Sequence, residues 1–230
     1  MKLIFLNLII TKTHNTYDKY SLYLWKKRLY NIVIEVINVI ISIVGLSGSG
    51  KSYIARTLET YNSRILHIDI DKIGHKSHQN HNVKQNLINA FGESILTNGE
   101  IDRKKLGHIV FNSSSSMQQL ENITWTFMEQ EIDRIIEENK NRIILLDWLL
   151  LPKTKFFFQS NVRILVKAPL DIRMERSTKR DNITKQKFLE RELSAPNIDE
   201  SQFEYIIENI DLEQTQERMK NIYDKSIIHR

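Results

Sequence analysis

The sequence has no cysteine, only three prolines and only seven glycines among 230 residues. Without cysteine the chain cannot form a disulfide framework, use a thiol nucleophile or bind zinc through thiolates, and this composition fits a reducing cytoplasm. Hydrophobic residues make up 41% and charged residues 27% of the chain, and these shares exclude the disordered and fibrous classes. We expect a globular, cytoplasmic protein with one core domain and room for an inserted subdomain.

The net charge is a modest +5 at pH 7. A positive balance suits anionic partners such as nucleotides, phosphorylated metabolites or nucleic acid, although a coding bias towards Lys, Ile and Asn explains it equally well. The sequence lacks a dense basic stripe interleaved with aromatic residues, which argues against nucleic-acid binding. We therefore expect a small-molecule substrate, no nucleic-acid partner, and a monomer or weak oligomer.

The segment 1–36 lacks the alternation of strand-like and helix-like stretches that the remaining chain shows. Its apolar run KLIFLNLII is not followed by the small residues of a signal-peptide cleavage site. A second apolar run, from Leu29, approaches the length of a membrane span, but it contains Asn31, Glu35 and Asn38, and its end is needed as a strand. We interpret this segment as an extension outside the core, either an extra helix or sequence translated from an early start codon. A membrane anchor is the less favoured alternative, and we expect no membrane association.

Three of the seven glycines fall within GLSGSGKS, residues 45–52, directly after the apolar run INVIISIV. The stretch matches G-x-x-x-x-G-K-[ST] between an expected strand and an expected helix, which is the context of a phosphate-binding P-loop. A loop that wraps a phosphate needs inward-pointing backbone N–H groups and the clearance that glycine supplies. The N-terminus of the following helix adds partial positive charge. An ordinary glycine turn between strand and helix is the alternative.

The P-loop predicts an ATP site with defined roles for two side chains. Lys51 would place its ammonium group on the β and γ phosphates, and the Ser52 hydroxyl would ligate Mg²⁺, the only metal that we expect. The residues expected to bind ATP in this loop are Gly45, Ser47, Gly48, Ser49, Gly50, Lys51, Ser52 and Tyr53.

Strand-like and helix-like segments alternate along residues 37–230, which predicts an α/β fold of the P-loop NTPase type, with a parallel sheet and helices on both faces. About seventy residues between the strand RILHIDID and the strand RIILLDWLLL show helical patterns only. This length is too great for a simple crossover. We expect a helical, acceptor-binding insert at about residues 75–140 and a lid at about residues 176–202.

Two aspartates and two arginines are the candidate catalytic groups. HIDID places Asp69 and Asp71 at the carboxyl end of a strand, where ligands bind in open α/β sheets. A carboxylate there can accept the proton of an acceptor hydroxyl, and we favour Asp71 for this role; the alternative is that one aspartate caps the next helix. Arg176 and Arg180 share a helix face, and lid arginines can accelerate phosphoryl transfer by about 10³–10⁵. A solvated basic face is an equal alternative for this pair.

Other P-loop classes fit less well. A GTPase needs an N-K-x-D motif, and the NKNR stretch from Asn139 lacks the aspartate. A motor or AAA-type ATPase needs paired acids at a strand end, whereas LLDW offers Asp147 alone, followed by tryptophan.

From about Ile40 onwards, the order of motifs resembles that of the dephospho-CoA kinase family. The most specific stretch is FGESILTNGEIDRKKLGHIVF, residues 91–111, with Arg103 in the family's arginine position. HIDIDKIGH resembles the family's D-x-D motif, in which Asp71 is the base. ERSTKRDNIT resembles the motif that opens the family's lid, and YIIEN, with Asn209, resembles its closing element.

The resemblance implies ATP-dependent phosphorylation of the ribose 3′-hydroxyl of dephospho-CoA, the last step of coenzyme A biosynthesis. It implies that Asp71, Lys51 and Arg180 act in phosphoryl transfer, that Arg176 binds ATP, and that Asp71 and Arg103 bind the acceptor. The chain departs from the family where DWLLLPKT replaces a proline- and glutamate-bearing motif. Because this difference lies near the acceptor, two alternatives stay open: a kinase of another nucleoside or nucleotide hydroxyl, and a nucleotide-binding regulator with little catalysis.

Overall fold

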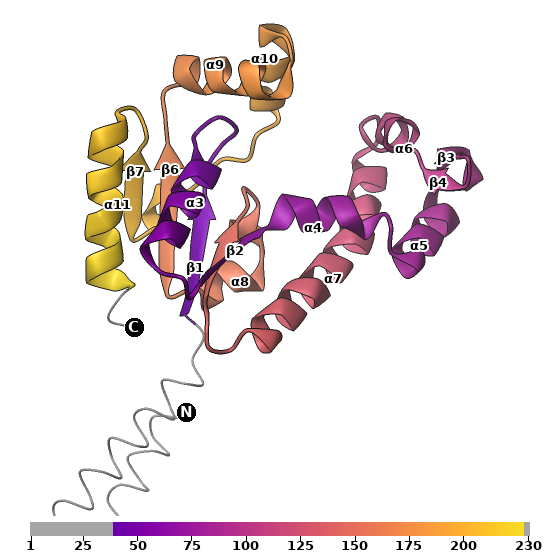
Figure 1. Cartoon of the computed structure of the whole chain (residues 1–230). Coiled ribbons are helices and arrows are strands. Elements are labelled where there is room, and N and C mark those ends of the chain that lie inside the picture. Colours follow the sequence, from indigo (N-terminus) through magenta and orange to yellow (C-terminus); the bar gives the residue numbers. More distant parts are fainter. Residues whose placement is uncertain (1–38, 228–230) are drawn as a thin grey trace, which may run out of the picture. The chain divides into compact units, whose positions relative to one another are not determined.

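The computed structural model describes residues 39–227, so the extension expected at residues 1–36 lies outside the described residues. A sheet of five strands forms the centre of this part of the chain (Figure 1). In chain order the strands are β1 (Val39–Val44), β2 (Ile65–Asp69), β5 (Ile143–Asp147), β6 (Val162–Lys167) and β7 (Tyr205–Glu208).

All pairings in this sheet are parallel, and the strand order is β2-β5-β1-β6-β7. The register places Ile41 of β1 opposite Leu145 of β5 and Val162 of β6. Parallel strands that are buried on both faces are nearly continuous apolar runs. The sequences of β1, VIISIV, and β5, IILLD, have this character. The expected parallel sheet is confirmed, although β5 ends at Asp147 and not after the three leucines that follow.

Helices cover both faces of the sheet, as expected. Successive side chains of a strand point to opposite faces. Ile41 and Ile43 accordingly pack in one hydrophobic cluster with α3 (Lys51–Tyr61) and α11 (Leu212–Ser226). Ile40 and Val44 pack in a second cluster on the opposite face. The other α-helices of residues 39–227 are α4 (Ile70–Ser77), α5 (His81–Phe91), α6 (Arg103–Val110), α7 (Ser114–Glu138), α8 (Lys155–Gln159), α9 (Leu170–Asp181) and α10 (Lys185–Leu193).

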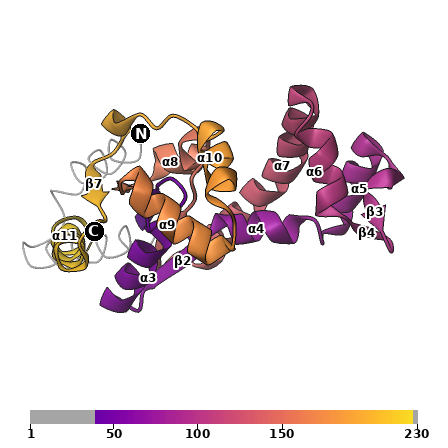
Figure 2. The ribbon, with the colours of Figure 1, turned by 90° about the horizontal axis from the view of Figure 1, so that it is seen from above.

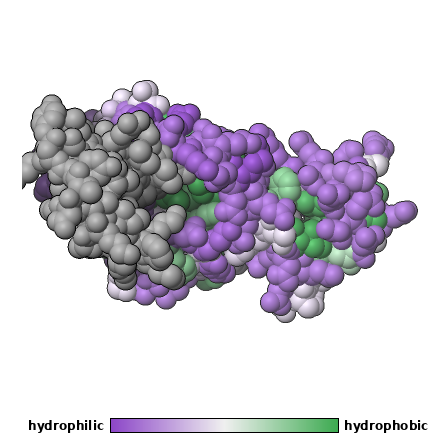
Figure 3. Space-filling view, turned by 90° about the horizontal axis from the view of Figure 1, so that it is seen from below, coloured by the Kyte–Doolittle hydropathy of each residue, from purple (hydrophilic) through white to green (hydrophobic). Residues whose placement is uncertain are grey.

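The chain between β2 and β5 contains helices α4 to α7 and its own hydrophobic cluster, formed by Val83, Leu87, Ile95, Leu106 and Val110. Figure 3 shows an apolar area on this part of the described surface, surrounded by hydrophilic residues. The boundaries of the insert at about 75–140 stay a prediction.

The expectation that this stretch holds helices only is wrong at one place. A short antiparallel hairpin joins β3 (Leu96–Thr97) to β4 (Glu100–Ile101). Its turn residues, Asn98 and Gly99, have φ values of 52° and 78°. A two-residue turn with both φ values positive favours Asn-Gly, so the local sequence already contained this signal.

Helices α9 and α10 lie beyond the carboxyl ends of β1 and β6, above the loop that joins β1 to α3 (Figures 1 and 2). Within residues 39–227, no helix combines the length and the apolar character that crossing a membrane would require.

Candidate active site

The loop from Gly45 to Gly50 joins β1 to α3, and its glycines are needed for both conformation and space. Gly48 and Gly50 have φ values of 79° and 93°, in the left-handed region that other residues seldom adopt. A Cβ atom at Gly48 would lie 2.2 Å from the carbonyl oxygen of Arg173. A Cβ atom at Gly50 would lie 2.0 Å from the side-chain nitrogen of Asn209. The loop therefore cannot accept larger residues at these two positions without moving its neighbours.

Asn209, directly after β7, braces this loop. Its side-chain Nδ2 donates a hydrogen bond to the backbone carbonyl of Ser49 at 2.8 Å. The backbone carbonyl of Asn209 accepts a hydrogen bond from the Arg176 guanidinium at 3.0 Å. The residue is 6% exposed. Ser49 is fully buried, so its side chain does not face the cavity. One asparagine thus ties the phosphate-binding loop to Arg176 of α9.

Asp147, at the end of β5, contacts the start of α3. Ser52 Oγ donates a hydrogen bond to Asp147 Oδ2 at 2.8 Å, and Lys51 Nζ lies 3.8 Å from Asp147 Oδ1. Burial of Asp147 would raise its pKa, but the nearby His67 imidazole, the charge of Lys51 and the hydrogen bond from Ser52 outweigh burial and hold the pKa below its usual value. The carboxylate is therefore ionised beside the predicted phosphate site.

His67, on β2, extends this contact away from the cavity. Its Nε2 lies 3.4 Å from Asp147 Oδ2, and its Nδ1 lies 3.6 Å from Oε2 of Glu59 on α3. The imidazole thus stands between two carboxylates, one of which carries the Ser52 hydrogen bond. Neither Asp147 nor His67 was predicted as a site residue from the sequence.

The residues present fit a magnesium ion that arrives with the nucleotide. Mg²⁺ prefers oxygen ligands and is held in such sites by one or two protein groups together with phosphates. The Ser52 hydroxyl and the Asp147 carboxylate supply hard oxygens, and Asp147 Oδ1 is buried without a hydrogen-bond partner in the part of the chain that the structure describes. Among residues 39–227, no cluster of three or more His, Cys, Asp or Glu side chains could hold a metal by itself.

The two aspartates of HIDID both border the cavity, because the chain turns helical immediately after Asp69. Asp69 caps α4 and accepts a hydrogen bond from the Lys72 backbone at 3.3 Å. Asp71 lies in the first turn of α4, where its Oδ1 accepts a hydrogen bond from Trp148 Nε1 at 3.0 Å. Desolvation raises the pKa of Asp71, and the charge of Lys51 opposes this effect in part. The helix-capping alternative therefore applies to Asp69, which leaves the Asp71 carboxylate for another role.

Three arginines of α9 have different partners. Arg180 Nη2 lies 3.3 Å from Ser47 Oγ in the loop, and Arg180 Nε donates to Asp181 at 2.7 Å. Arg176 contacts the carbonyl that follows β7, as described above. Arg173 is buried and forms a bidentate ion pair with Glu192, so it fastens α9 to α10. The lid at about 176–202 stays a prediction.

A cavity of about 900 Å³ connects these groups. Its lining includes most of the predicted site residues, namely Gly45, Ser47, Gly48, Gly50, Lys51, Ser52, Tyr53, Asp71, Arg176 and Arg180. Arg103 does not line it; its guanidinium donates to the carbonyl of His75, a lining residue, at 2.9 Å. The cavity lining also includes Trp148, which was not predicted as a site residue from the sequence.

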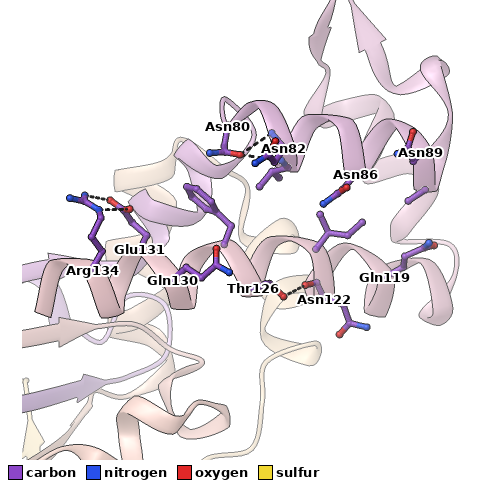
Figure 4. Close-up of a pocket in the computed structure, with 14 residues that line it drawn as sticks. Asn80, Asn82, Asn86, Asn89, Gln119, Asn122, Thr126, Gln130, Glu131 and Arg134 are labelled. Atoms are coloured by element: carbon purple, nitrogen blue, oxygen red, sulfur yellow. Dashed lines mark hydrogen bonds and ion pairs between the residues drawn. The ribbon is translucent and has the colours of Figure 1, made fainter. Parts of the chain in front are cut away.

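A second cavity, of about 810 Å³, lies between α5 and α7 (Figure 4). Amide side chains such as Asn80, Asn86 and Asn122 line it. It contains none of the predicted site residues and is separate from the P-loop cavity.

Comparison with known sequences adds two findings. A family model described as dephospho-CoA kinase matches residues 39–211. A dephospho-CoA kinase from Aquifex aeolicus (strain VF5) is 30% identical over 191 residues, which cover 80% of this chain and 96% of the relative.

Two solved structures share the fold. The crystal structure of TT1252 from Thermus thermophilus has a TM-score of 0.73 and 23% identity and covers 83% of this chain and 98% of its own. A dephospho-CoA kinase from Campylobacter jejuni has a TM-score of 0.51 and 19% identity and covers 82% of this chain and 97% of its own.

Proposed function

Because this chain belongs to the dephospho-CoA kinase family, we propose that it transfers the γ-phosphoryl group of ATP to the ribose 3′-hydroxyl of dephospho-CoA and so forms coenzyme A. The observation that carries the proposal is a single cavity bordered by both the P-loop and the carboxylate of Asp71. The first would hold the donor phosphates and the second the acceptor hydroxyl, which is the arrangement that direct phosphoryl transfer requires.

In this proposal, Asp71 accepts the proton of the 3′-hydroxyl as the oxygen bonds to the γ-phosphorus. The bond between that phosphorus and the bridging oxygen to the β-phosphate breaks, and ADP leaves. The backbone N–H groups of the loop and the Lys51 ammonium would hold the β and γ phosphates. The direct contact between Arg180 and Ser47 supports a role for Arg180 beside the transferred group.

Magnesium would be held by Ser52 and Asp147 together with the phosphates, and it would neutralise charge on the β and γ oxygens. The Ser52–Asp147 hydrogen bond keeps both oxygens at the start of α3. Arg176 would bind ATP from its position beside Asn209.

Arg103 has a less direct place in the proposal. Its guanidinium is fixed to the carbonyl of His75, which borders the cavity. Arg103 would therefore meet the acceptor at the side of the cavity formed by α4. A cytoplasmic location and a monomeric or weakly oligomeric state stay predictions.

The decisive test is ATP consumption by the full chain with dephospho-CoA, beside a panel of nucleosides and nucleotides, with the phosphorylated product identified by mass. We expect turnover on dephospho-CoA and addition of one phosphate at the 3′ position. Clear turnover on a nucleoside with none on dephospho-CoA would contradict the proposed acceptor.

A substitution separates a kinase from a nucleotide-binding regulator. Asp71→Asn should lower turnover by orders of magnitude and leave ATP binding intact, because the amide cannot accept the proton. Asp224→Asn, at an exposed ion pair with Lys220 on α11, is the matched control and should be neutral. Equal behaviour of the two variants would favour a binding protein.

A further inference from the structure

The carboxylate of Asp71 has one specific partner. Within residues 39–227, the indole N–H of Trp148 is the only group that donates a hydrogen bond to it, with Nε1 3.0 Å from Oδ1. The second carboxylate oxygen, Oδ2, accepts no hydrogen bond from any residue in this described range. One oxygen is therefore anchored while the other remains available to a substrate hydroxyl.

Trp148 is held rigidly enough to act as an anchor. The residue follows β5 directly and is 6% exposed. Its backbone N–H donates to the Ile43 carbonyl at 3.2 Å, which ties it to β1. Its ring meets Trp125 of α7 edge to face, with centroids 5.4 Å apart and planes at 67°. Strand and ring contacts together fix where the N–H points.

The Trp148 indole N–H can only donate a hydrogen bond, so it stabilises a group that accepts one. A buried tryptophan usually satisfies its N–H in this way, and here the acceptor is the proposed base. A hydrogen bond to the ionised carboxylate favours the ionised form, which can accept a proton.

We propose that Trp148 is a positioning residue, whose indole N–H holds one oxygen of Asp71 so that the other faces the acceptor hydroxyl. This inference rests on the proposed function, because it assigns the base a fixed orientation. It also couples the base to the insert, since Trp125 on α7 supports the ring that carries the N–H.

Other charged groups act on the same carboxylate and would remain after the loss of Trp148. Lys51, Asp69, Asp147 and Arg180 all interact electrostatically with Asp71. Desolvation raises the pKa of Asp71, whereas the Trp148 hydrogen bond and the Lys51 charge lower it. Removal of the indole N–H should therefore shift the acidic limb of the pH–rate profile to higher pH, with the other groups unchanged.

The contact can be tested without any activity. The ¹⁵N-labelled chain has three tryptophans, and Trp148→Phe identifies the Trp148 indole resonance. We expect that resonance to move with pH in the wild-type chain and to lose this movement in Asp71→Asn. A resonance that ignores both pH and the substitution would overturn the proposal.

The positioning role is tested by kinetics. Trp148→Phe keeps an aromatic ring and should lower kcat by about 10- to 100-fold, the size expected for losing one hydrogen bond to a charged group, with little change in the KM for ATP. Phe158→Leu, at an exposed aromatic residue of α8, is the control and should retain kcat, because its ring packs on Phe157 and does not line the cavity.

A double variant distinguishes positioning from a merely structural effect. In the Asp71→Asn background, Trp148→Phe should cause no further loss of kcat, because the residue acts through Asp71. Independent, multiplying losses would overturn the proposal. Failure of the wild-type chain to phosphorylate dephospho-CoA would instead contradict the proposed function. In that case, the positioning role of Trp148 would be tested by the NMR result and by the kinetics with the nucleoside that is turned over.

Discussion

Ser52 Oγ lies 2.8 Å from Oδ2 of Asp147, so the first turn of α3 and the end of β5 are joined by a hydrogen bond at the P-loop. The strand order explains this contact. β5 lies between β2 and β1, and Asp147 pairs in register with both Ile43 and Asp69. Residues 95 positions apart are thereby brought to the same edge of the sheet.

Asp147→Asn should impair catalysis more than nucleotide binding. The amide keeps the shape and can still accept from Ser52, but it removes a charge that would help to hold the metal. We expect kcat to fall by about 10²–10³-fold, as for the loss of a strong electrostatic contact in a transition state, together with a higher Mg²⁺ requirement. Magnesium titrations of the steady-state rate provide the measurement. Asp133→Asn, at an exposed ion pair on α7, is the control and should leave the magnesium curve unchanged.

Gly50→Ala should abolish tight ATP binding. The new Cβ would meet the side-chain nitrogen of Asn209 at 2.0 Å and would force a left-handed conformation as well. Gly99→Ala is a matched control, because Gly99 also has a positive φ, 78°, but open space around it. Both variants should lose about 1–2 kcal/mol of folding free energy from backbone strain. Only Gly50→Ala should lose nucleotide affinity in calorimetry, and equal affinities in the two variants would count against the proposed cradle.

Asn209→Ala should loosen the P-loop, whereas the backbone carbonyl that accepts a hydrogen bond from Arg176 is kept. The substitution removes the hydrogen bond to the Ser49 carbonyl and leaves that buried acceptor unpaired, which costs about 1–3 kcal/mol. We expect a lower melting temperature and a raised KM for ATP. Asn86→Ala, on the exposed face of α5, should change neither. A normal KM in Asn209→Ala would show that the loop keeps its shape without the brace.

The raised pKa of Asp71 predicts an unusual pH dependence of stability. Between 3.8, the ordinary value, and its raised folded-state pKa, the folded chain binds more protons than the unfolded chain. Stability therefore falls as pH rises through this window, and ionised Asp71 destabilises the fold above it. Asp71→Asn should raise the melting temperature at neutral pH, and this gain should disappear below the window.

Asp102→Asn is a control of opposite sign. Hydrogen bonds from Thr97 and from the backbone of α6 lower the pKa of Asp102. Its ionised form therefore stabilises the fold above pH 3.8, and this stability is lost as pH falls through the lowered pKa. The substitution should lower the melting temperature at neutral pH. Identical pH profiles for the two variants would refute the assigned shifts.

The parts of the fold that sequence predicts well depend on local patterns. The conformation of GLSGSGKS depends on its own glycines. The apolar strands and amphipathic helices can be recognised from the periodicity of their hydrophobic residues. The parallel sheet follows from their alternation. The Asn98-Gly99 hairpin was missed although its signal is equally local, because helical patterns surround it on both sides.

The phosphate loop, the α/β class and the family can be predicted from local sequence, because each depends on neighbouring residues whose spacing is visible along the chain. The contacts of Asp147 with Ser52 and His67, of Asn209 with Ser49 and of Trp148 with Asp71 could be found only in the folded chain. The last pair is 77 positions apart in sequence. The physical reason is that strand order and register bring distant chain segments to the same edge of a sheet, and nothing in the local spacing of the residues encodes that order.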